Sequence, residues 1–286
     1  MNKKNCCQMV TDRIIEQLER GLIPWEKPWG GIRGGAYNRI TSKPYSLMNQ
    51  MILKHTGEYA TFHQWVNLGG RIKKGEKAEK IFFWKIIKVE KETEEKRKKV
   101  MIPILKTYSV FHISQVENVQ PKEQNLAAVK PMGQGERILQ KYIDREKLLF
   151  KEVVSDDAYY SPLKDIVVIP CKEQYSHMNE YYSTAFHEMI HSTGHPKRLG
   201  RFENIQSVLG KKEDYSKEEL VAEMGSSYLM NLAEIETKKT FRNSAAYIQN
   251  WLQVLRNDNR FIVSAASKAE QAVCYILGEK IEKNLE

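Results

Sequence analysis

The sequence predicts an α+β protein in two parts, and three features of its 286 residues predict it. Short segments rich in β-branched and aromatic residues alternate with segments whose apolar residues recur at helical spacing. Apolar residues make up 41% of the chain and charged residues 28%, close to the average of globular proteins, which excludes wholesale disorder. The net charge of +9 is confined to the first half of the chain and so distinguishes two regions.

The two regions differ in charge. Residues 1–125 contain 23 Lys and Arg against 13 Asp and Glu, a balance of +10, whereas residues 126–286 contain 22 against 23, a balance of −1. A basic region favours binding to a polyanion, with a solvated lysine-rich surface as the alternative. No stretch approaches the roughly 18 apolar residues that a membrane-spanning helix needs. We therefore expect a soluble, cytoplasmic protein with no membrane partner.

The elements of the first half follow from local patterns. Helices are expected where apolar residues recur at helical spacing: 4–21, 44–56 and 61–68. Two prolines exclude regular helix from 24–31, which is expected to be a rigid aromatic loop. Strands are expected in two β-branched, aromatic stretches: 81–89 and 101–112. Between them, the mixed charges of 90–99 predict an exposed hairpin end.

The second half is predicted to begin after a linker. Prolines and glycines indicate that linker at about 118–135, dividing a domain at 1–125 from a domain at 126–286. Helices are then expected over five stretches: 136–143, 179–193, 217–235, 243–257 and 261–283. Strands are expected over 153–160 and 165–169. The second strand is a candidate edge strand to which an extended substrate adds, with core packing as the alternative.

An HExxH sequence, His187-Glu188-Met189-Ile190-His191, lies within the helix expected over 179–193. Positions four apart on a helix lie one turn above each other, so the imidazoles of His187 and His191 can bind one metal ion. Glu188 is then placed to take a proton from a water at that metal and return it, which makes it the predicted catalytic residue. The alternative is a pair of surface or capping histidines.

A hydrolytic metal site needs a third protein ligand. Glu219 and Glu223 share one face of a predicted helix; Glu219 is the expected ligand and Glu223 the partner of a ligating histidine, with the reverse as the alternative. His195 competes as a ligand, but it follows Gly194, where the helix is expected to end. Zinc is the expected ion, and the same ligands accept manganese, cobalt or nickel. The implied reaction is metal-assisted hydrolysis of a peptide or similar amide.

The first half interleaves aromatic and basic residues. Cations can follow phosphates while flat side chains stack on unpaired bases, so this pattern predicts binding to single-stranded DNA. Some of these aromatic side chains must also fill the core, and for each tryptophan both roles stay open. The predicted DNA contacts are Trp25, Trp29, Arg39, Lys43, Tyr45, Arg71, Lys73, Lys74 and Lys77.

Ordered motifs cover nearly the whole chain. They include Gly21-Leu22-Ile23-Pro24-Trp25, Thr41-Ser42-Lys43-Pro44-Tyr45, Gly75-Glu76-Lys77, Tyr182-Ser183-Thr184 leading into His187, Ser192-Thr193-Gly194-His195, and Glu218 through Glu223. In these motifs the chain resembles the ArdC-type antirestriction proteins of conjugative elements. The resemblance implies an N-terminal domain that binds single-stranded DNA, a C-terminal zincin-like metallopeptidase domain, and protection of incoming DNA from host restriction. Zincins commonly take a glutamate ligand four residues before another polar residue, which favours Glu219.

Two other functions stay open. One is a protein that coats single-stranded DNA and whose metal site is structural or inactive. The other is an effector metalloprotease with no nucleic-acid role. If the protein is a peptidase, a host restriction component is a candidate substrate.

Overall fold

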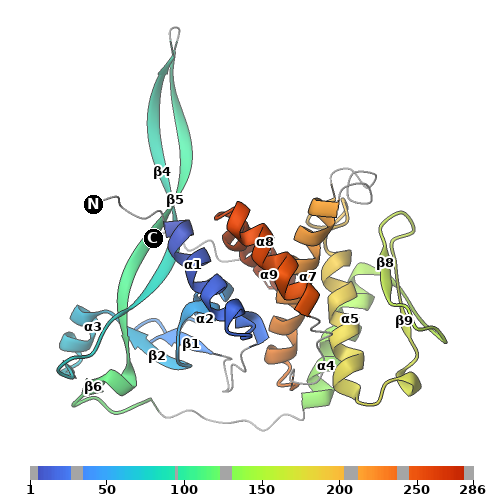
Figure 1. Ribbon diagram of the computed structural model, residues 1–286, viewed down its shortest axis with the longest axis horizontal. Coiled ribbons are helices and arrows are strands. Elements are labelled where there is room, and N and C mark those ends of the chain that lie inside the picture. Colours follow the sequence, from blue (N-terminus) through green and yellow to red (C-terminus); the bar gives the residue numbers. More distant parts are fainter. Residues whose placement is uncertain are drawn as a thin grey trace.

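The structure, a computed structural model, describes residues 6–26, 35–93, 96–122, 131–202, 212–236 and 245–279. Helices and strands both contribute to each half, so the α+β prediction is confirmed (Figure 1). No helix in these ranges is both long and apolar enough to cross a membrane.

The first half is built around a four-stranded sheet in the order β1-β2-β5-β4. Its strands, with the separate pair β3 and β6, are β1 (Ala36–Asn38), β2 (Gly57–Ala60), β3 (Arg71–Ile72), β4 (Glu79–Thr93), β5 (Lys96–His112) and β6 (Val116–Glu117). Its helices are α1 (Cys6–Glu19), α2 (Leu47–Ile52) and α3 (Phe62–Asn67), with 3₁₀ turns η1 (Pro24–Glu26) and η2 (Ile113–Gln115).

The β4–β5 hairpin is longer than its apolar sequence predicted. Pairing continues from Glu79–Val110 to Thr93–Lys96, and the hairpin projects from the rest of the molecule (Figure 1). Main-chain hydrogen bonds between antiparallel strands do not depend on side-chain polarity, so the ladder extends through the charged stretch. The prediction that residues 90–99 form only an exposed hairpin end is therefore wrong: residues 90–93 belong to β4 and residues 96–99 belong to β5.

The second half places a small sheet beside a group of helices. Its strands are β7 (Leu149–Val153), β8 (Tyr159–Ser161) and β9 (Ile166–Pro170). Its helices are α4 (Pro131–Glu146), α5 (Met178–Ser192), α7 (Lys212–Leu232), α8 (Ala245–Asn257) and α9 (Phe261–Leu277), with a 3₁₀ turn η3 (Lys172–Gln174).

Two sequence predictions for this half are corrected. Strand β9 is the middle strand, parallel to β7 and antiparallel to β8, so the stretch 165–169 is no edge strand. Its residues Ile166–Pro170 are all buried, and a buried strand paired on both sides reads as an apolar run. The predicted linker ends earlier than expected, because α4 begins at Pro131, and proline is well tolerated in a first helical turn. Residues 123–130 lie outside the described part of the chain.

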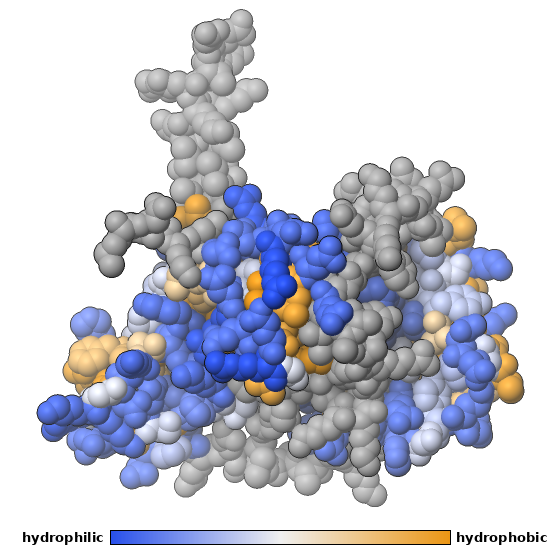
Figure 2. Space-filling model, in the orientation of Figure 1, coloured by the Kyte–Doolittle hydropathy of each residue, from blue (hydrophilic) through white to orange (hydrophobic). Residues whose placement is uncertain are grey.

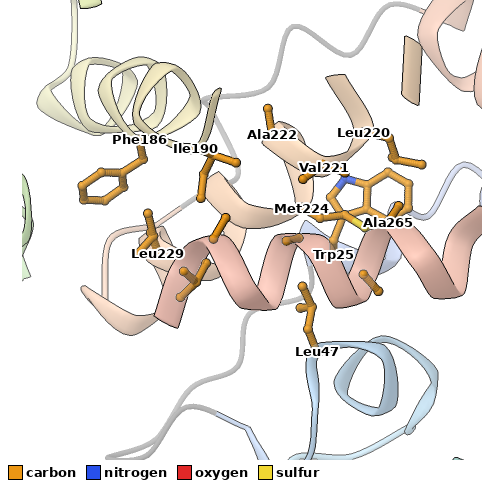
Figure 3. Packing of buried hydrophobic residues seen from close by; sticks show 14 of the residues in the cluster. Trp25, Leu47, Phe186, Ile190, Leu220, Val221, Ala222, Met224, Leu229 and Ala265 are labelled. Atoms are coloured by element: carbon orange, nitrogen blue, oxygen red, sulfur yellow. The ribbon is translucent and has the colours of Figure 1, made fainter. Parts of the chain in front are cut away.

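The main apolar core joins the two halves of the chain. It contains residues of α1 and α2 together with residues of α5, α7 and α9. Figure 3 labels members from α2, α5, α7 and α9. Helix α1 packs on α8 and α9, and Thr11 donates a hydrogen bond of 2.8 Å to the carbonyl of Asn259. The division into domains at residue 125 stays a prediction. The consequence for experiments is that the first half should be studied within the full chain.

Candidate metal centre

Helix α5 carries the HExxH sequence and has a defined end. Its core side buries Tyr182, Phe186 and Ile190, while His187 and His191 lie one turn apart on another face. The last helical residue is Ser192. Beyond it, Arg201 donates a hydrogen bond of 2.8 Å to the carbonyl of Ile190, which also accepts hydrogen bonds from the N–H and the hydroxyl of Thr193.

A close approach of α5 and α7 brings the third candidate ligand, the carboxylate of Glu219, to the two histidines. A Cβ on Gly225 of α7 would lie 2.6 Å from Cδ1 of Ile190, so a larger residue there would push the helices apart. One residue later, Ser226 Oγ donates a hydrogen bond of 3.0 Å to the carbonyl of Ser183 on α5. These contacts fix the separation of the two helices, and Glu219 projects from α7 at this contact.

His187, His191 and Glu219 form a compact group of three donors. The Nε2 atoms of the two imidazoles are 3.0 Å apart, and Glu219 oxygens lie 3.4 Å from Nε2 of His187 and 3.3 Å from Nε2 of His191. Ligands at about 2.1 Å from one ion are about 3.4 Å apart in a tetrahedron and about 3.0 Å apart at adjacent corners of an octahedron. The donor set and its spacing therefore fit a divalent cation in either geometry.

Two further carboxylates face the outer nitrogens of the same rings. Glu223 Oε1 lies 3.7 Å from Nδ1 of His187, and Glu218 Oε1 lies 3.5 Å from Nδ1 of His191. Carboxylates at this position hold Nδ1 protonated, so that Nε2 keeps its lone pair for an ion. The sequence predicted a hydrogen bond between Glu223 and a ligating histidine, and the structure gives a separation of 3.7 Å; Glu218 was not predicted to face a histidine. The adjacent pair Glu218-Glu219 was the signal in the sequence that could have indicated Glu218. Neighbouring helical residues point about 100° apart, so the two carboxylates can approach the histidines from different directions.

Arg201 fixes Glu218 in place. Its guanidinium donates two hydrogen bonds to the carboxylate, from Nε to Oε2 at 3.1 Å and from Nη2 to Oε1 at 2.6 Å. Both side chains are largely buried, so water competes little for this pair. No motif in the sequence indicated Arg201, because its partners come from α5 and α7 rather than from its own segment.

The carboxylates determine the charge of the histidines when no cation is bound. Burial alone would lower the pKa of both imidazoles, but the facing carboxylates outweigh it. The pKa of His187 is raised, and that of His191 is raised to about 10. Burial alone would raise the pKa of Glu219, but hydrogen bonds from the two imidazoles hold it well below its usual range. The site therefore concentrates negative charge that suits a cation.

Glu188 and His195 differ in their relation to this group. Glu188 is buried, and its charge contributes to raising the pKa of both His187 and His191. His195 is buried but lies outside the three-donor group. Its Nδ1 accepts a hydrogen bond of 3.2 Å from the main-chain N–H of Lys197. Among the described residues, the competing assignment of His195 as a ligand therefore has no geometric support.

Three of the predicted DNA contacts have side chains that are buried or ion-paired within the fold. Trp25 is 0% exposed and Tyr45 is buried, so neither ring offers a free face to a base, and these two predictions are wrong for this structure. Aromatic rings are strong core formers, and burial overrode their capacity to stack. Arg39 is ion-paired with the buried carboxylate of Glu58. Trp29 lies outside the described residues.

The remaining predicted contacts are exposed cations: Lys43, Arg71, Lys73, Lys74 and Lys77. Near the last four, three large apolar side chains are also exposed on and after α3, Phe62 at 50%, Val66 at 48% and Leu68 at 41%. Figure 2 shows an apolar patch over α3 beside hydrophilic residues. Phe62 is one of the aromatic residues interleaved with cations in the sequence, but nothing there indicated that Val66 and Leu68 are exposed, because their spacing along the short helix is also that of a buried face.

Comparison with known proteins identifies the family. Residues 4–111 match the N-terminal domain of anti-restriction factor ArdC, and residues 139–268 match a zincin-like metallopeptidase family. The antirestriction protein ArdC from plasmid R388 has the same fold in its metal-free crystal structure, with a TM-score of 0.74 and 28% sequence identity over 96% of this chain and 99% of that one. This chain is an ArdC-type protein. The Mn(II)-bound structure of the R388 protein has a TM-score of 0.76 and 29% identity over 96% of this chain and 97% of that one.

The ArdC-type chain also resembles parts of longer proteins. Two Escherichia coli proteins named DNA primase TraC are 31% and 29% identical over 96% of this chain, which spans 27% and 20% of their lengths. The chain therefore spans about a quarter or less of these two relatives. The uncharacterized protein y4eC of Sinorhizobium fredii is 28% identical over 92% of this chain and 89% of its own length.

Proposed function

We propose that this ArdC-type chain serves antirestriction on a mobile element, binding single-stranded DNA with its first half and hydrolysing peptide bonds at a divalent cation held by His187, His191 and Glu219. The observation that carries the proposal is that the two Nε2 atoms are 3.0 Å apart and that each lies within 3.3 to 3.4 Å of an oxygen of the Glu219 carboxylate, Oε2 for His187 and Oε1 for His191. The structural relative whose crystal form contains Mn(II) supports a divalent ion, and zinc or manganese are the ions proposed for this chain.

The residues around the site have separate roles in the proposed hydrolysis. A bound cation would supply Lewis-acid chemistry, polarising a substrate carbonyl and making a water more acidic. Glu188 takes the proton of the attacking water and returns it to the leaving amine. Glu218 and Glu223 keep Nε2 of the two histidines directed at the ion. An extended substrate would pair with β7 or β8, the outer strands of the small sheet.

Replacement of the proposed base separates peptidase activity from the other functions. A Glu188→Gln chain should bind the metal and single-stranded DNA as wild type does, while cleavage of an unstructured protein such as casein, measured with Zn²⁺ or Mn²⁺ present, falls by at least about 100-fold. DNA protection from restriction should fall with it. If Glu188→Gln protects DNA as well as wild type, the coating function is correct. If neither protein binds single-stranded DNA, the effector function is correct.

A rigid basic turn is the proposed site for the DNA backbone. Gln115 holds the turn by hydrogen bonds from its Nε2 to Glu76 Oε2 at 2.8 Å and to the carbonyl of Lys77 at 3.1 Å. Gly75 has φ +89°, a conformation that favours glycine. The cations carried by this turn and the preceding strand β3 are Arg71, Lys73, Lys74 and Lys77. All four are exposed and lie within seven positions of the chain, from 71 to 77.

The exposed face of α3 is the proposed site for bases. Phe62 and Val66 are one turn apart on it, and the chain passes from there directly into the basic turn. A flat apolar surface beside clustered cations is complementary to unpaired bases on a phosphate backbone. Lys43, which is exposed in another loop, stays a proposed contact on charge alone.

Salt titration of the full chain tests this surface. Binding of labelled single-stranded DNA should weaken linearly on a log–log scale, and each of Lys74→Gln and Lys77→Gln should reduce the slope by about 0.7. Lys268→Gln, an exchange of a cation on α9 in the other half, is the control and should leave the slope unchanged. If wild type and all three variants have the same slope, DNA does not bind at this turn.

A further inference from the structure

Trp25 comes from the first half of the chain but packs against the helix that carries Glu219. It lies in η1, which contacts α7, and Ser227 Oγ of α7 donates a hydrogen bond to the carbonyl of Trp25. Figure 3 shows the indole among Val221, Met224 and the α9 residue Ala265. The Trp25 ring also packs edge-on against Trp251 of α8, with 5.2 Å between ring centroids.

This contact lies opposite the contact of α7 with α5. Successive helical residues are about 100° apart, so Met224 and Ser227 lie at about 140° and 80° from Glu219. Gly225 and Ser226, which contact α5, lie at about 240° and 340°. Helix α7 is therefore held between two surfaces. Ile190 packs against the side of α7 that faces α5, and Trp25 packs against the other side, where its carbonyl accepts the hydrogen bond from Ser227.

The metal centre depends on that position. Glu219 comes from α7, whereas both histidines come from α5, so a movement of α7 changes the distances of 3.4 and 3.3 Å between the carboxylate and the two Nε2 atoms. Bonds to a metal vary by only about 0.2 Å. A displacement of α7 by a fraction of an ångström is therefore enough to weaken the third ligand.

We infer that Trp25 is a positioning residue of the metal centre: it holds α7 against α5 so that Glu219 reaches the ion. The inference rests on the proposed function, because it requires that His187, His191 and Glu219 bind a metal. It assigns to the first half of the chain a role in the metal site besides contact with DNA. A smaller side chain at this position leaves space behind α7 and lets the helix relax away from α5.

Titration of the full chain with Co²⁺ tests the inference, since the visible absorption of Co²⁺ depends on the number and geometry of its ligands. Trp25→Phe should weaken Co²⁺ binding roughly 10-fold, as the loss of a supporting residue does elsewhere, and should change the visible spectrum. Trp65→Phe is the matched control. Trp65 is also 0% exposed, but it belongs to a separate cluster with Ala60 and Val116. It should bind Co²⁺ as wild type does.

A milder variant covers the case in which Trp25→Phe does not fold. Ser227→Ala removes the hydroxyl that bonds the Trp25 carbonyl and should weaken Co²⁺ binding by roughly 2- to 5-fold, in line with the loss of one hydrogen bond. Unchanged affinity in folded Trp25→Phe or Ser227→Ala protein overturns the inference, and so does an equal loss in Trp65→Phe. If wild type itself binds no Co²⁺, the proposed function fails instead.

Discussion

The candidate metal centre and the proposed DNA-binding region were predicted from different kinds of pattern, and the structure treats their predicted residues differently. The metal centre rests on spacing: residues four apart on a helix share a face wherever the helix lies, and His187 and His191 do so here. The proposed DNA-binding region rests on composition, which does not distinguish a buried ring from an exposed one, and Trp25 and Tyr45 are buried. Spacing predicts geometry, whereas composition predicts only that suitable side chains exist.

The largest effect is expected at Glu219, and the comparison fails if this residue is not needed for metal binding. Glu219→Ala should weaken Zn²⁺ binding by more than roughly 100-fold, because a direct ligand contributes more than the outer partners whose loss costs about 10- to 100-fold. Competition with a chelator measures the affinity. Glu173→Ala, which removes an exposed carboxylate in the same half, is the control. If Glu223→Ala has the larger effect, the alternative assignment of the ligand is correct.

Arg201 sharpens the comparison, because it belongs to the metal centre but no spacing predicted it. Arg201→Gln removes the paired hydrogen bonds to Glu218 and should weaken Zn²⁺ binding roughly 10- to 100-fold. Arg201→Lys should bind Zn²⁺ more tightly than Arg201→Gln but less tightly than wild type, since an ammonium cannot reproduce both hydrogen bonds of the guanidinium. An Arg201→Gln protein that folds and binds Zn²⁺ like wild type would show that Glu218 does not support His191.

Replacement of Phe62 makes the corresponding test in the proposed DNA-binding region. Phe62→Ala should weaken binding of single-stranded DNA by about 1–3 kcal/mol while leaving the salt dependence unchanged, because stacking releases no counterions. Fluorescence anisotropy with a labelled oligonucleotide measures both quantities. Tyr159→Ala is matched in exposure, at 49%, but lies on β8 in the other half and should have no effect. Equal losses of DNA affinity in both variants would show that α3 is not part of the DNA-binding surface.

The smallest expected effect concerns stability near the end of α5. Burial alone would raise the pKa of the Asp165 carboxyl, but hydrogen bonds from Arg198 and Tyr160 lower it below its usual value. A lowered pKa in the folded state means that the stabilisation is present above about pH 4 and is lost as the pH falls through the folded-state pKa.

Asp165→Asn should therefore lower Tm by about 2–4 °C at pH 7 and have little effect near pH 2, as thermal unfolding monitored by circular dichroism can measure. Asp156→Asn, at an exposed position nearby, is the control. A Tm difference that is the same at both pH values would show that the Asp165–Arg198 ion pair does not stabilise the fold.

Much of the helical framework was predictable from the sequence, and its limits have physical causes. The periodicity of α5 predicted a helix over 179–193, and the observed range is Met178–Ser192. The pairing of β9 with both β7 and β8, and the contacts of Arg201 with α5 and α7, are relations between separate elements, which the pattern within one segment does not report. The burial of Trp25 likewise depends on α7 and α8, which belong to the other half of the chain.

X-ray absorption spectroscopy of the full chain loaded with one equivalent of Zn²⁺ tests the central claim most directly. Two imidazole nitrogens and oxygen ligands at about 2.0–2.2 Å are expected in the first coordination shell. The imidazole signal should disappear in a His187→Ala, His191→Ala chain. A shell made only of oxygen in the wild-type protein, or one that contains sulfur, would contradict the claim that His187, His191 and Glu219 hold the metal.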